Sequence, residues 1–160
     1  MRFPRVPVVL SVVFLSGFCL LVHELAHAFA ALCCGGSIRE FVLISLTPHV
    51  RVSGPFTLAQ NSWICVAGSA AEVLLFLLML WFAPRTRGGR LAIEVTGLFA
   101  AIELIGWGLS AIAYPYGPRN TDVWKFLSNT GLHPGLVLWA CLVTAVVFFV
   151  AYRTRLRSHS

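Results

Sequence analysis

Residues 6–34 read VPVVLSVVFLSGFCLLVHELAHAFAALCC, an apolar stretch that nevertheless contains His23, Glu24 and His27. About 20 mostly apolar residues are enough for a helix to cross a bilayer, so this stretch predicts a membrane span. An ionisable side chain near the bilayer centre costs roughly 2.5–3.5 kcal/mol on insertion scales. We therefore expect a compensating interaction around these three residues, and a bound metal ion is the simplest candidate.

The rest of the chain has the composition of a membrane protein. Of its 160 residues, 58% are hydrophobic and only 11% are charged, and the mean hydropathy is +0.83. Soluble domains carry about twice this share of charge. Four apolar stretches are long enough to span a bilayer, at about 6–34, 61–83, 91–114 and 135–152. With no internal repeat or long linker, residues 1–160 predict one all-α membrane domain with four transmembrane helices.

The net charge of +6 comes from basic residues at the ends of the predicted spans. They form no basic stripe with interleaved aromatic residues, so binding to nucleic acid is not predicted. Eight of the 12 basic residues fall on one side of the membrane, namely Arg2, Arg5, Arg85, Arg87, Arg90, Arg153, Arg155 and Arg157. The positive-inside rule then predicts a multi-pass protein of the cell membrane with both termini in the cytoplasm.

Two β-rich runs, 41–46 and 50–55, lie between the first and second spans around Thr47-Pro48-His49. This pattern predicts a short β-hairpin. An open strand edge cannot face lipid, so the hairpin is expected at the membrane surface or against protein. Its free edge is suited to pair with an extended peptide.

His23 and His27 are four residues apart, and this spacing places both imidazoles on one face of a helix. Two such histidines with an intervening glutamate form the pattern of a zinc hydrolase, in which Glu24 takes a proton from a metal-activated water. Random placement of the five histidines and five glutamates gives about 0.005 expected occurrences of the pattern. A metal-free hydrogen-bonded cluster or a proton relay remains the structural alternative.

Catalytic zinc usually takes three protein ligands, so a third is needed. Asp122 follows the third span and therefore falls toward the same membrane face as the motif, which favours it over His49 and His133. Asp122 alternatively caps a helix over 123–129.

Two further groups of residues are expected to support the motif. The ligating histidines need acceptors for their second N–H groups, and the candidates are Glu72, Glu103 and Asn120. The small residues 67–71 at the start of the second span predict close packing against the first span.

Together these motifs resemble the site-2 protease family of intramembrane zinc metalloproteases, particularly its small bacterial members. The similar segments are 23–27, the glycines 35–36, the small-residue run 67–72 and Asn120-Thr121-Asp122. The resemblance implies that His23, His27 and Asp122 bind zinc and that Glu24 is the catalytic base. Val123 stands where the family usually has glycine, and Ala70 and Glu72 replace its usual proline and asparagine. The family's site also lies nearer the cytosol, whereas the charge pattern places this one nearer the outer face.

The sequence thus predicts a membrane metalloendopeptidase that uses Zn²⁺ to hydrolyse a peptide bond in or next to a transmembrane segment. Its partners would be the lipid bilayer and a membrane-protein or peptide substrate. The alternatives are a non-catalytic pseudoprotease or binding module that retains a structural metal, and a transporter or ion relay. Replacement of Glu24 by glutamine would separate these classes.

Overall fold

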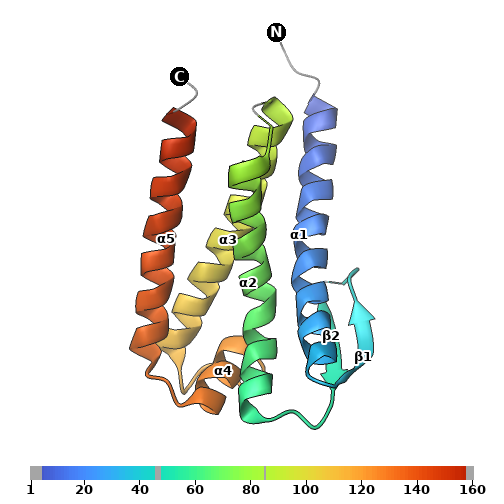
Figure 1. Ribbon diagram of the computed structural model, residues 1–160, viewed down its shortest axis with the longest axis vertical. Coiled ribbons are helices and arrows are strands. Elements are labelled where there is room, and N and C mark those ends of the chain that lie inside the picture. Colours follow the sequence, from blue (N-terminus) through green and yellow to red (C-terminus); the bar gives the residue numbers. More distant parts are fainter. Residues whose placement is uncertain (1–4, 46–47, 85, 158–160) are drawn as a thin grey trace.

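A computed structural model describes residues 5–45, 48–84 and 86–157. Arg2 and Arg85 of the charge pattern lie outside these residues, as do Leu46 of the predicted run 41–46 and Thr47 of the expected turn. Four long helices stand side by side, with a short helix and a two-stranded sheet at one end (Figure 1). In chain order the elements are α1 (Arg5–Cys33), β1 (Ser37–Val42), β2 (His49–Ser53), α2 (Leu58–Phe82), α3 (Arg87–Ala113), α4 (Asp122–Thr130) and α5 (Pro134–Arg157).

The predicted fold class is confirmed, because four helices are long and apolar enough to cross a membrane and a hairpin separates the first two. The second and third spans begin a few residues earlier than predicted. The hydroxyl of Thr57 accepts a hydrogen bond from the backbone N–H of Gln60, and the hydroxyl of Thr86 accepts one from the N–H of Gly89. These caps satisfy N–H groups at the polar starts of α2 and α3, which hydropathy alone does not mark as helix.

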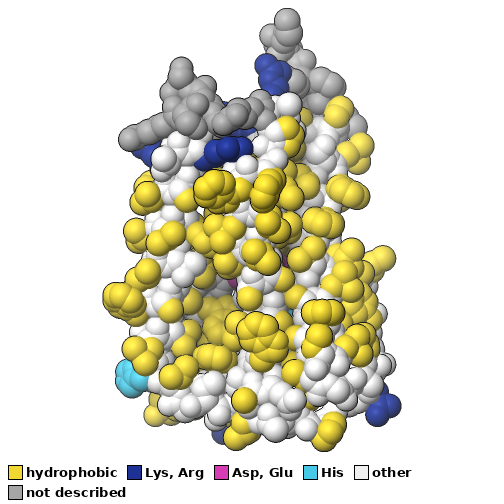
Figure 2. Space-filling view, viewed as in Figure 1, with side chains coloured by type: hydrophobic (Ala, Val, Ile, Leu, Met, Phe, Trp, Pro, Cys, Tyr) yellow, Lys and Arg dark blue, Asp and Glu magenta, His cyan; other side chains and the backbone are white. Residues whose placement is uncertain are grey.

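The start of α1 and the end of α5 lie at the same end of the bundle, and the hairpin and α4 lie at the other (Figure 1). Figure 2 shows most of the visible Lys and Arg side chains gathered at the first of these ends. The distribution matches the charge pattern of the sequence. Which end faces the cytoplasm stays a prediction of the positive-inside rule.

Small residues bring α1 and α2 together near the hairpin end. Ala30 and Ala31 of α1 are buried against Ile64 and Ala67 of α2. Side chains of this size let two helix backbones approach closely, and in lipid such packing replaces the hydrophobic effect as the source of helix association. The predicted close packing of the second span on the first is confirmed.

The short helix α4 is fixed by an apolar cluster at the lower end of the bundle. Val123 and Leu127, one helical turn apart, are buried with Ala111 of α3 and Val137 of α5. Gly131 ends α4 in the left-handed conformation, with its N–H donating to the carbonyl of Leu127. This anchoring sets the position of the first residue of α4.

The hairpin pairs β1 and β2 antiparallel, with Phe41 opposite Val50 and Val42 opposite His49. Its first strand spans Ser37–Val42, earlier than the predicted run 41–46. The pairing of Ser37 with Ser53 explains the shift, because this register extends β1 back toward the end of α1 rather than forward. The strands therefore lie directly beside the last turns of α1 (Figure 1).

Candidate metal centre

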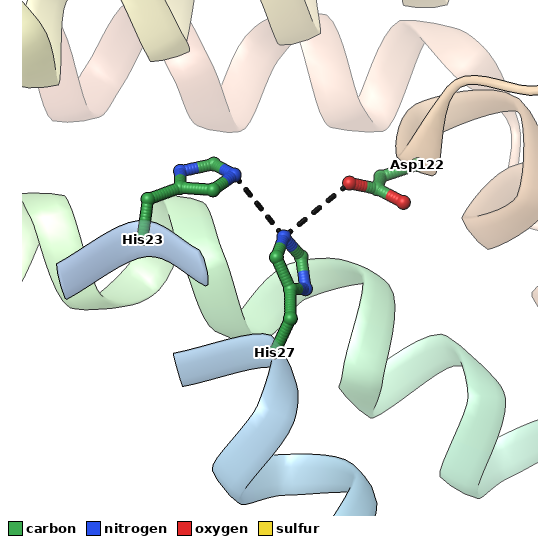
Figure 3. A group of neighbouring side chains, drawn as sticks. All are labelled: His23, His27 and Asp122. Carbon is green, nitrogen blue, oxygen red and sulfur yellow. Dashed lines mark hydrogen bonds and ion pairs between the residues drawn. The ribbon is translucent and has the colours of Figure 1, made fainter. Parts of the chain in front are cut away.

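His23 and His27 point their rings to the same place from successive turns of α1. Their Nε2 atoms are 3.1 Å apart, and the ring centroids are 4.8 Å apart in an edge-to-face arrangement. Figure 3 shows both side chains directed away from the axis of α1 toward α4. The helical spacing seen in the sequence therefore produces the expected convergence.

Asp122 joins the two histidines from α4. Its Oδ2 atom lies 3.5 Å from Nε2 of His27, on the side of that ring that also faces His23 (Figure 3). The interpretation of Asp122 as a helix cap is wrong, because the hydroxyl of Thr121 caps α4 by accepting the N–H of Trp124. Since Thr121 supplies the cap, the Asp122 carboxylate is left to face His27.

The second nitrogen of each ring has its own acceptor. Nδ1 of His27 donates to the backbone carbonyl of Ile64 at 2.6 Å, and Nδ1 of His23 lies 3.3 Å from Oε1 of Glu72. A proton on Nδ1 leaves the Nε2 lone pair free, and such partners orient imidazoles that bind a metal. Sequence reasoning named Glu72 as one of three candidates. It missed Ile64, because a backbone carbonyl leaves no mark in the side-chain pattern.

The other two candidate acceptors occupy different positions. Glu103 lies near the same ring, with its Oε1 atom 3.9 Å from Nδ1 of His23. Asn120 is exposed at the start of the segment that leads into α4. The alternative third ligands also lie elsewhere, because His49 is in β2 beside Glu40 and the ring of His133 accepts the N–H of Gly135.

Gly68 of α2 provides the space for both imidazoles. A Cβ atom at this position would lie 2.6 Å from Nε2 of His23 and would also overlap Nε2 of His27. Real Cβ atoms essentially never come so close to another heavy atom. The small-residue run of the second span thus has a particular use, which is to let the helix backbone pass directly beside the two rings.

The donors suit a zinc ion in kind and spacing. Ligand atoms of His23, His27 and Asp122 all lie within 4.8 Å of one another. Tetrahedral zinc with bonds of about 2.0–2.1 Å separates neighbouring ligand atoms by about 3.3 Å, close to the two distances given above. Two imidazoles and one carboxylate leave a fourth position open, as catalytic zinc requires. Glu24 is only 7% exposed and follows His23 directly.

A bundle of four membrane-length helices with a cluster of buried and partly buried histidines and carboxylates defines a multi-pass membrane protein with a candidate metal site. The family model described as Peptidase M50B-like matches residues 6–113, and the chain belongs to this family. The resemblance to site-2 proteases is thereby confirmed, and the chain is a membrane protein of a peptidase family. The match covers α1 to α3 and ends before Asp122. Comparisons with curated proteins and with solved structures gave no significant match.

Proposed function

We propose that this chain is a zinc-dependent intramembrane endopeptidase that cleaves a peptide bond in or next to a substrate's transmembrane segment. One observation carries the proposal: the donor atoms of His23, His27 and Asp122 converge between α1 and α4 of a peptidase-family member. Buried ionisable side chains in membrane spans are expensive and usually functional.

In the proposed site His23, His27 and Asp122 would bind the ion, and Glu24 would accept and transfer the proton. Zinc, when bound, supplies a Lewis acid that polarises a peptide carbonyl and lowers the pKa of water. The carboxylate of Glu24 accepts a proton from the attacking water and transfers it to the leaving amine. Ile64 and Glu72 hold the rings of the two histidines, so that neither imidazole has to reorient during the reaction.

The hairpin is the proposed contact for an extended substrate. Strand β1 is exposed, and Arg51 of β2 forms an ion pair with Glu40 at 3.3 Å, which suits the membrane–water boundary. Since β1 and β2 form a two-stranded sheet, each has an edge that can pair with a peptide. A substrate segment unwound at this edge would lie beside the end of α1, within reach of water.

Metal analysis tests the proposal most directly. Detergent-purified wild-type protein is expected to carry zinc, whereas a His23→Ala variant is expected to carry none, as measured by elemental mass spectrometry. An equal zinc content in the two proteins would contradict the proposed site. The matched control is Glu94→Gln, which removes an exposed carboxylate paired with Arg90 on α3.

A cleavage assay distinguishes an enzyme from a non-catalytic binding module. In vesicles that contain a panel of single-span membrane proteins, the wild type is expected to release fragments identifiable by mass spectrometry. Glu24→Gln is expected to keep its zinc and lose this activity, because the ligands remain while the proton acceptor is gone. Zinc binding without cleavage by the wild type would favour a pseudoprotease, and cleavage by Glu24→Gln would exclude the assigned role of Glu24.

The charge pattern also supports an orientation with both termini in the cytoplasm of a cell-membrane protein. Reporter fusions at the two termini and in the hairpin turn measure this orientation. Cytoplasmic signals from both termini and an external signal from the hairpin are expected, and the reverse would place the site toward the cytosol.

A further inference from the structure

The ring of His23 has a second polar face, turned away from His27. Its Nδ1 atom lies 3.3 Å from Oε1 of Glu72 on α2 and 3.9 Å from Oε1 of Glu103 on α3. The ligand atoms of these three residues lie within 4.8 Å of one another. One imidazole therefore stands between two sets of metal-binding side chains.

The two carboxylates lack enough positive partners. Glu72 is 2% exposed, and its Oε2 atom is buried without a hydrogen-bond partner among the described residues. A single N–H on Nδ1 cannot neutralise two carboxylates, and a buried charge without compensation is strongly unfavourable. The Oε2 atom of Glu72 is therefore open to one further partner, which is either a proton or a cation.

Glu103 is held in place by a chain of hydrogen bonds. Its Oε2 atom accepts a 2.6 Å hydrogen bond from the hydroxyl of Ser69, which in turn accepts one of 2.7 Å from Nε1 of Trp107. These contacts use one carboxylate oxygen and direct the other, Oε1, toward His23. Such fixed orientation is typical of a residue that ligates a metal.

The missing partner fits a divalent cation. The distances of 3.3 and 3.9 Å from Nδ1 to the two carboxylates are close to the ligand spacing of about 3.3 Å around tetrahedral zinc. We propose that Glu72, Glu103 and Nδ1 of His23 form a second divalent-cation site, on the opposite side of the His23 ring from the site with His27 and Asp122. A mixed set of imidazole and carboxylate suits Zn²⁺ and similar first-row cations.

A cavity lies beside Glu103. Glu103 lines a cavity of about 380 Å³ between α2, α3 and α5, together with Ser69 and Trp107. Figure 2 shows acidic atoms within the hollow between α5 and α2. Glu103 is the one proposed ligand of the second site that lines this cavity, and neither His27 nor Asp122 lines it.

A shared ligand couples the two sites. In the first site His23 binds through Nε2 and keeps a proton on Nδ1 that faces Glu72. A cation at the second site would displace that proton to solvent, and the ring of His23 would then be shared between two ions, which would change how it binds the first ion. Excess zinc is therefore expected to inhibit the proposed peptidase, although cation binding at the second site itself requires no peptidase activity.

Zinc stoichiometry tests the second site on the intact chain. Equilibrium dialysis of detergent-purified protein against rising free Zn²⁺ is expected to show two equivalents for the wild type and for Glu94→Gln, and one for Glu103→Gln. Saturation of the wild type at one equivalent, or retention of two by Glu103→Gln, would overturn the second site and leave the proposed function standing. If the wild type bound no zinc, both the second site and the proposed function would be contradicted.

A measurement on the wild type alone guards against variants that fail to fold. X-ray absorption at the zinc edge is expected to report two imidazole ligands per ion at one equivalent. At saturation fewer imidazoles and more oxygens per ion are expected, because Glu72 and Glu103 join while the histidines are divided between two ions. An unchanged ligand ratio would contradict the proposal.

In His27→Ala the first site should be lost while one equivalent, bound by His23, Glu72 and Glu103, remains.

Discussion

The two halves of α1 are both apolar, but the second half has a face buried against other helices, whereas most of the first half is exposed. In the first half large side chains are exposed, as for Phe14 at 74%, and this face would contact lipid. In the second half His27 is 7% exposed and Ala31 is fully buried against other helices. Small residues mark the buried face of the second half, since Ala28, Ala30 and Ala31 are buried there. The large side chains of the same half, Leu25, Phe29 and Leu32, are exposed. Residue size, rather than hydropathy, separates the face that packs on protein from the face that meets lipid.

The largest effect should come from the buried half, at His27. His27→Ala removes a proposed ligand, so zinc affinity should fall by more than the roughly 10–100-fold typical of changes in outer partners. Cleavage should fall to background. Zinc titration and the vesicle assay measure the two losses, with Phe14→Leu in the first half as the control. If His27→Ala kept normal zinc affinity at the first site, His27 would not be a ligand of the first ion.

Gly68→Ala tests how closely α2 approaches the two histidine rings of α1. The new methyl group would overlap the rings of His23 and His27, and such overpacking lowers the free energy of unfolding by about 1–3 kcal/mol. Zinc binding should weaken as well. Gly17→Ala is the matched control, because a Cβ atom there meets nothing within 4 Å. Unfolding in detergent titrations measures both variants, and equal stability would mean that α2 does not approach the rings closely.

Glu72→Gln should have a smaller effect on the first site. Its carboxylate orients the ring of His23 without sharing the ion of the first site, so zinc affinity at that site should fall by about 10- to 100-fold. The measurement is competition with a chelator of known affinity, with Glu94→Gln as the control. A loss as complete as that of His27→Ala would instead make Glu72 a ligand of the first ion.

The smallest effect is expected in the exposed half. Phe14→Leu changes a side chain that contacts little protein, so the free energy of unfolding should change by less than about 0.5 kcal/mol. Ala31→Leu should lower the free energy of unfolding by about 1–3 kcal/mol, because Ala31 is fully buried and a larger side chain would overpack the site. Equal effects of the two substitutions would contradict the division of α1 into a lipid face and a protein face.

The sequence predicts the four spans, the hairpin and the convergence of His23 with His27, because each depends on a local period or on span length. The proximity of Asp122 to the two histidines follows from topology alone. The chain crosses the membrane at each span, so the ends of the first and third spans lie on the same side. The roles of Asp122 and Thr121 at the start of α4 could not be separated, because both residue types cap helices. The order of Glu72 and Glu103 around His23 depends on the rotation of α2 and α3, which no spacing encodes.

Helix α4 also has a consequence for how the protein is made. Asp122 lies on α4, after α3, whereas both histidines lie on α1. Ribosomes deliver the chain from its N-terminus, so the imidazole pair enters the membrane long before its carboxylate is synthesised. The full donor set exists only once three spans are in place and Val123 and Leu127 have docked. Unfinished chains thus lack part of the proposed donor set, so metal binding at the proposed centre would begin only after α4 has docked.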